Sequence, residues 1–90
     1  MTEVNQNISW DEAASAKYQT MLKKIPLFHR EITKQVVDKK AVLNAQERQS
    51  SVVEESDIIK AFLTEVPKAF YSMMIRIMDD VGFEYKKYDT

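Results

Sequence analysis

Apolar residues recur every three or four positions along most of the chain, which is the spacing of one face of an α-helix. This pattern predicts four helices, over about residues 10–25, 27–48, 55–65 and 68–81. Pro26 lies between the first and second helices, and Pro67 lies between the third and fourth. A proline disfavours helix at the preceding residue and fits the first turn of the next helix, so each proline marks the turn of a helix pair. The expected fold is a small all-α bundle of two helix–proline–helix hairpins.

The same pattern predicts the start and buried faces of the first two helices. Ser9 and Glu12 have the spacing of a capping box, so the first helix is expected to begin near Trp10. Its buried stripe is expected to comprise Trp10, Ala13, Ala14, Tyr18, Met21, Leu22 and Ile25. The inner face of the second helix is expected to comprise Phe28, Ile32, Val36, Val37, Val42 and Leu43.

The fourth helix has the most regular apolar stripe, so it is the expected central helix of the core. The stripe comprises Val66, Ala69, Phe70, Met73, Met74, Ile77, Met78 and Val81. Gly82 is expected to close this helix in the left-handed conformation, with Phe83 folded back against its last turn.

A very short extended clip is expected at Val52 and Val53. One glycine and two prolines provide too few turns for a sheet with several hairpins. The two valines are nevertheless β-branched, and they precede an acidic helix start at Glu54, Glu55 and Asp57.

The two halves of the chain match each other in part. The two prolines lie 41 residues apart, and a shift by that distance aligns several apolar positions. The aligned pairs include Tyr18/Ile59, Met21/Phe62, Leu22/Leu63, Ile25/Val66, Ile32/Met73, Val36/Ile77 and Val37/Met78. Either the hairpin is a quasi-repeat, or two unrelated amphipathic helix pairs broken by proline match by chance.

Composition bounds the class of protein. A length of 90 residues, with 44% hydrophobic and 30% charged residues, suits a single soluble domain. Residues 1–8 are expected to be a flexible N-terminus and residues 84–90 a polar tail. The polar start and the lack of an apolar run of about 20 residues favour a cytoplasmic location without membrane insertion.

Charge and cysteine content argue against some partners and cofactors. The net charge of -1 argues against nucleic-acid binding, because phosphate contacts from lysine and arginine dominate that affinity. Without cysteine, the chain has no thiolate ligands for a metal or an iron–sulfur cluster.

Candidate chemistry is sparse. His29 is the only histidine, and one histidine cannot supply the several ligands of a zinc site. Met21, Met73, Met74 and Met78 suggest a soft-metal or adaptable binding surface, but their helical spacing favours core filling. No phosphate loop or nucleophile–base motif occurs. We therefore expect no catalytic, cofactor-binding or metal residues, and no catalytic activity of the chain alone.

Several aromatic residues lie near the ends of the expected elements. They are Trp10, Phe28, Tyr71, Phe83, Tyr85 and Tyr88. Such positions build either end caps of a small core or a patch that faces a partner. Tyr71 lies off the main stripe of the fourth helix and is expected to be exposed.

Residues 10–13 (WDEA), 24–30 (KIPLFHR) and 53–59 (VEESDII) carry a resemblance to a known family. They resemble motifs of the small helical domain at the C-terminus of the B subunit of light-independent protochlorophyllide reductase. The resemblance extends to about residue 62. Leu27 and His29 replace the family's phenylalanine and valine, and Glu54 replaces a capping threonine.

The resemblance implies a non-enzymatic accessory module. Such a module docks on a larger nitrogenase-like reductase subunit or covers a tetrapyrrole-type ligand site. In that family the larger subunits carry the iron–sulfur cluster and the substrate pocket. The candidate interaction surface is Phe28, His29 and Arg30 at the first proline corner, together with Tyr71.

Two expectations separate scaffold from function at this corner. Phe28→Ala is expected to destabilise the protein by about 3 kcal/mol or more if the ring lies in the core. Arg30→Ala is expected to leave stability nearly unchanged and to weaken partner binding.

Two alternatives to the accessory module remain open. A long helix, an extended clip and a further helix also occur in histone-like folds, so one alternative is a nucleic-acid-binding dimer. The other is a stand-alone protein of unknown activity.

Overall fold

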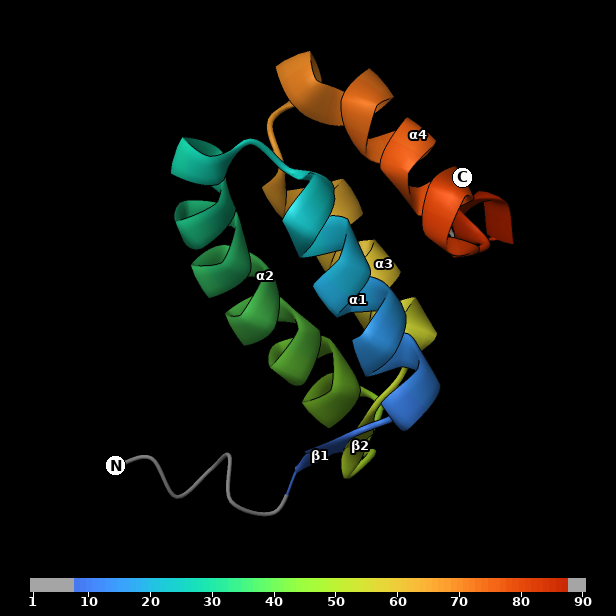
Figure 1. Ribbon diagram of the computed structural model, residues 1–90. Coiled ribbons are helices and arrows are strands. Elements are labelled where there is room, and N and C mark those ends of the chain that lie inside the picture. The colour runs from blue at the N-terminus through green and yellow to red at the C-terminus, as the bar shows by residue number, and fades with distance from the viewer. Residues whose placement is uncertain (1–7, 88–90) are drawn as a thin grey trace.

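The computed structural model describes residues 8–87 as a bundle of four α-helices, which confirms the all-α expectation (Figure 1). The elements are β1 (Ser9–Trp10), α1 (Glu12–Lys24), α2 (Leu27–Glu47), β2 (Val52–Val53), α3 (Glu55–Glu65), η2 (Lys68–Phe70), α4 (Tyr71–Val81) and η3 (Tyr85–Lys87). Tyr88 and the expected flexible N-terminus, apart from Ile8, lie outside the described residues. Across residues 8–87, no helix is long and apolar enough to cross a bilayer.

The four helices form two hairpins that turn at the same end of the bundle. The turns between α1 and α2 and between α3 and α4 both lie opposite the small sheet (Figure 1). α2 packs mainly against α3, and α4 packs mainly against α1. The second helix of each hairpin therefore packs against the first helix of the other hairpin.

The central helix is α3, and the expectation that the fourth helix fills this role is wrong. α3 buries Asp57, Ile58, Ile59, Ala61 and Phe62. α4 buries Met74, Ile77 and Met78. A stripe as regular as that of α4 marks a helix with a single buried face, whereas a helix with neighbours on several sides is buried more evenly.

The start of the first helix differs from the capping box expected at Ser9. The N-cap is Asp11, whose Oδ2 accepts a hydrogen bond of 2.9 Å from the amide of Ala14. Ser9 and Trp10 instead form β1, which pairs in parallel with Val52 and Val53 of β2. The clip was therefore expected correctly, but its partner strand was not, because that pairing is distant in sequence.

The buried face of α2 is also different from the expected one. Its fully buried residues are Val37, Ala41 and Ala45, spaced four apart. The small alanine side chains allow α2 to approach α3 closely. Phe28, Ile32, Val36 and Leu43, all expected inside, are instead exposed.

A buried carboxylate fixes the junction between β2 and α3. Asp57 is 1% exposed, and its Oδ2 accepts the Glu54 amide hydrogen at 2.8 Å in a capping box. The guanidinium of Arg48, at the end of α2, donates to Asp57 at 2.9 and 2.6 Å. This bidentate pair compensates the buried charge, so the loop is anchored to both helices.

The end of α4 matches the expectation. Gly82 has a φ of 88°, in the left-handed region that favours glycine. The amides of Gly82 and Phe83 both donate to the Met78 carbonyl, at 3.0 and 2.9 Å. Phe83 is buried against the core.

Candidate functional site

The two proline corners have nearly the same backbone. Ile25 and Val66 have φ and ψ angles of -84° and 139°, and of -86° and 133°. The following prolines have angles of -52° and 140°, and of -59° and 147°. The same extended pair therefore ends one helix and begins the next in both hairpins.

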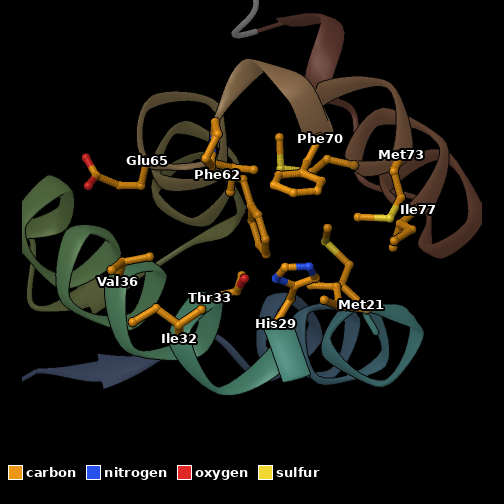
Figure 2. A pocket seen from close by; sticks show the side chains of 14 residues that line it. Met21, His29, Ile32, Thr33, Val36, Phe62, Glu65, Phe70, Met73 and Ile77 are labelled. Atoms are coloured by element: carbon orange, nitrogen blue, oxygen red, sulfur yellow. The ribbon is translucent and has the colours of Figure 1, made fainter. Parts of the chain in front are cut away.

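A largely apolar pocket of about 280 Å³ lies between the corners (Figure 2). The 41-residue shift pairs most of its lining residues: Met21/Phe62, Ile25/Val66, His29/Phe70, Ile32/Met73, Thr33/Met74 and Val36/Ile77. Pro67 and Glu65 line the pocket without their counterparts Pro26 and Lys24. The pocket thus lies where two equivalent hairpins meet, which supports the quasi-repeat over chance similarity.

An imidazole between two phenyl rings forms one wall of this pocket. The His29 ring lies 4.3 Å from the Phe28 ring and 5.2 Å from the Phe70 ring, measured between centroids. Phe28 is 82% exposed, whereas His29 is half-buried and projects toward the cavity (Figure 2). His29 and Phe70 occupy equivalent positions of the two corners, so this contact joins the two hairpins.

The methionines fill the core and also line the pocket. Met21, Met74 and Met78 are buried, as expected for core residues. Met21, Met73 and Met74 face the pocket, while Met78 lies outside its lining. Core filling is therefore confirmed for Met21, Met74 and Met78, two of which also belong to the pocket lining. Flexible thioether side chains adapt to ligands of different shape, and a binding role of the stripe stays a hypothesis.

Arg30 has a structural role at the first corner. Its guanidinium donates to the carbonyl of Ile25 at 3.3 and 3.1 Å, and to that of Lys23 at 3.1 Å. These carbonyls belong to the C-terminal end of α1, where a cation is favoured. The expectation that Arg30 contributes little to stability therefore conflicts with these contacts.

Tyr71 occupies the position equivalent to Arg30 in the second corner. Its side chain is half-buried and packs against the core, so the expectation that it is exposed is wrong. It is also outside the pocket lining. Of the four candidate surface residues, only His29 lines the pocket, and Phe28 contacts its ring from the exposed side. Arg30 contacts the backbone of the first corner, and Tyr71 packs against the core.

The outward side of α2 carries an apolar stripe that we call the outer stripe: Phe28, Ile32, Val36 and Leu43. Their exposed fractions are 82, 56, 36 and 43%, and Leu27 beside them is 74% exposed. Exposed apolar patches of this kind mark interaction sites. The spacing of the stripe is visible in the sequence, but the same spacing fits a buried face. The sequence therefore predicts these residues on the inner side of the helix, whereas they face outward.

A polar network lies on the other side of α2 and also has a structural role. The Tyr18 hydroxyl donates to Asp38 at 2.5 Å, and the Lys34 ammonium donates to the same carboxylate at 2.8 Å. Trp10 stacks on the Tyr18 ring, with 5.8 Å between centroids. Burial, and then the Asp38 carboxylate, hold the pKa of Tyr18 well above its usual value. The phenol therefore remains a hydrogen-bond donor.

Three lining residues of the pocket carry polar groups: His29, Thr33 and Glu65. Sequence reasoning named only His29, because Thr33 and Glu65 come from separate helices and belong to no motif. Within residues 8–87, no group of three or more histidine, cysteine, aspartate or glutamate side chains is placed to hold a metal ion.

Comparison with family models, curated proteins and solved structures finds no match for this chain. The resemblance to the reductase domain therefore stays a hypothesis. The geometry of the corners and of α2 is the basis for the functional proposal.

Proposed function

We propose that this chain is a non-enzymatic helical module that docks on a larger protein through the first proline corner and the outer stripe. The exposure of Leu27 and Phe28 carries this proposal. Their counterparts in the second corner are Lys68 and Ala69, so the shared backbone does not require large apolar residues here. Exposure of two such apolar side chains to water is unfavourable, and a docking partner that covers them would remove this cost.

The outer stripe extends this surface along α2. Phe28, Ile32, Val36 and Leu43 lie on one side of the helix, and Phe70 from η2 adds a further exposed ring near His29. An apolar stripe on a helix suits a groove or helix of another protein. By the resemblance, the candidate partner is a nitrogenase-like reductase subunit.

Pocket size favours a protein partner over an enclosed tetrapyrrole. The pocket holds about 280 Å³, just below the roughly 300–1,000 Å³ of typical ligand sites. A four-ring macrocycle is too large for it. Any tetrapyrrole contact in this proposal therefore lies across the outer stripe, with the pigment held mainly by the partner.

Titration of the ¹⁵N-labelled protein tests this proposal. The probes are purified subunits of light-independent protochlorophyllide reductase and, separately, protochlorophyllide. We expect amide shifts at residues 27–43 with the protein subunits. Failure of every probe to shift these amides would refute docking on this reductase. An electrophoretic mobility shift of duplex DNA by the protein, weakening steeply with salt, would instead favour the histone-like alternative.

A residue swap between the corners supplies the matched control. Leu27→Lys/Phe28→Ala installs the residues of the second corner in the first, and is expected to abolish the shifts. Lys68→Leu/Ala69→Phe makes the reverse change at an equivalent backbone position, and is expected to retain them. Equal losses in both variants would contradict a surface specific to the first corner.

A further inference from the structure

Beyond docking, we propose that the pocket between the proline corners binds a planar aromatic amine of about two fused rings, such as an indole with an amino side chain. Leu27 and Phe28 of the docking corner do not line the pocket, whereas Ile32 and Val36 of the outer stripe do. Its size, its wall chemistry and its charge each narrow the ligand class.

The volume sets the size of the ligand. An engineered apolar cavity of about 150 Å³ accepts benzene. The pocket here holds about 280 Å³, which is close to twice as much. It therefore accommodates a bicyclic ring system and excludes larger fused systems from full burial.

The walls favour a flat aromatic ligand over an alkyl chain. Phe70 and His29 present partly exposed rings from η2 and α2, and the fully buried ring of Phe62 from α3 lies behind them (Figure 2). Rings gain from stacked or edge-to-face contacts with another aromatic system. The thioether of Met73, which is half-buried, adds favourable contacts with aromatic ring edges. An alkyl chain would gain apolar burial without these directional contacts.

The charge of the lining selects an amine over a carboxylate. Glu65 is the acid among the lining residues; it is exposed, and its carboxylate points away from the other lining side chains (Figure 2). Neither lysine nor arginine belongs to the lining. A protonated amine on a side chain that leaves the pocket at this rim can therefore pair with Glu65, whereas an acid would meet like charge there. The His29 imidazole can either donate or accept a hydrogen bond, so it can bind a ring N–H or a ring nitrogen.

Calorimetric or NMR titration with three matched indoles tests this proposal. Tryptamine, indole and indole-3-acetate share the ring and differ in the charge of the side chain. At about pH 8, we expect affinity to fall in that order. The dissociation constant of tryptamine should be on the order of 0.1–1 mM. Absence of saturable tryptamine binding at about 10 mM, or tighter binding of the acid, would overturn the proposal.

Variants distinguish this pocket from adventitious surface binding. Glu65→Gln should weaken tryptamine about two- to fivefold, the range of an exposed ion pair, and leave indole unchanged. Val36→Phe should block the pocket and weaken all ligands at least about tenfold. Leu43→Phe, on the same stripe but outside the lining, should have no effect. Equal effects of the two phenylalanine variants would contradict the assignment.

Two further variants keep the test decisive. Ile32→Trp is a second blocking change at a lining position that is already 56% exposed, so it should fold even if Val36→Phe does not. Leu27→Lys/Phe28→Ala should retain ligand binding, because neither residue lines the pocket. Loss of tryptamine binding in the folded Leu27→Lys/Phe28→Ala variant would place the ligand at the docking surface instead.

Discussion

The two proline corners have one backbone and different side chains, and this contrast separates folding from function. Ile25–Pro26 and Val66–Pro67 turn the chain in the same way, and the pocket-lining residues beside them fall into equivalent pairs. The first corner then continues with Leu27 and Phe28, and the second with Lys68 and Ala69. The second corner turns without large apolar residues at these two positions, so the exposed side chains of Leu27 and Phe28 are available for binding.

The hairpins also differ at their far ends. Ala41 and Gly82 are equivalent positions, but α2 continues through Ala41 whereas α4 ends before Gly82. Glycine adopts the left-handed conformation that stops the second hairpin. The extra turns of α2 carry Ala45 and Arg48 to β2 and α3, and so connect the two halves of the repeat.

The largest expected effect separates the shared core from the exposed corner. Phe62→Ala should destabilise the protein by about 3–5 kcal/mol, because its ring is fully buried at the centre. Phe28→Ala should change the free energy of unfolding by less than about 0.5 kcal/mol, since its ring is 82% exposed. Urea denaturation of both variants checks this difference, and similar losses would show that Phe28 belongs to the core.

Arg30 provides the next test, because the two corners differ at this position. Arg30 donates hydrogen bonds to backbone carbonyls of the first corner, whereas its counterpart Tyr71 packs against the core. Arg30→Ala should cost about 1–2 kcal/mol, as it removes hydrogen bonds to the carbonyls of Lys23 and Ile25. Arg30→Lys should recover only part of this loss, because an ammonium lacks the planar fork that reaches both carbonyls. If Arg30→Ala kept the wild-type thermal stability, this result would contradict a structural role of Arg30 and favour a role in binding alone.

Tyr18 differs from its aligned counterpart Ile59 in carrying a hydroxyl group that donates to Asp38, and this group gives a pH-dependent test. The pKa of Tyr18 is raised in the folded protein, so the contribution of its hydroxyl to the free energy of unfolding is complete below about pH 10. This contribution falls at higher pH, where the unfolded chain loses the phenolic proton and the folded chain retains it. Each further pH unit should remove about 1.4 kcal/mol of stability. Tyr18→Phe should cost about 1 kcal/mol at neutral pH and lose this dependence. An unchanged alkaline dependence would exclude Tyr18 as its cause.

Sequence reasoning succeeded where local rules control the chain. The proline corners, the bounds of α3 and the Gly82 terminus depend on residues that are neighbours in sequence. It failed where packing decides between two apolar faces. α2 carries both the alanine row of Ala41 and Ala45 and the bulkier outer stripe, and hydrophobicity alone favours the bulkier one.

The candidate site was predictable only in part for the same reason. His29 stood out as the single histidine, and the 41-residue shift already aligned several residues that line the pocket. The cross-contact between His29 and Phe70 depends on how the two hairpins pack. Glu65 reaches the same pocket from α3, and no local pattern marks it.

The Leu27→Lys/Phe28→Ala swap tests the central claim most directly, with stability and reductase binding measured on the same sample. The free energy of unfolding should stay within about 0.5 kcal/mol of the wild-type value, because both side chains are largely exposed. Binding to the reductase subunits should be lost. A large loss of stability, or retention of binding by the folded variant, would contradict the assignment of this corner to docking.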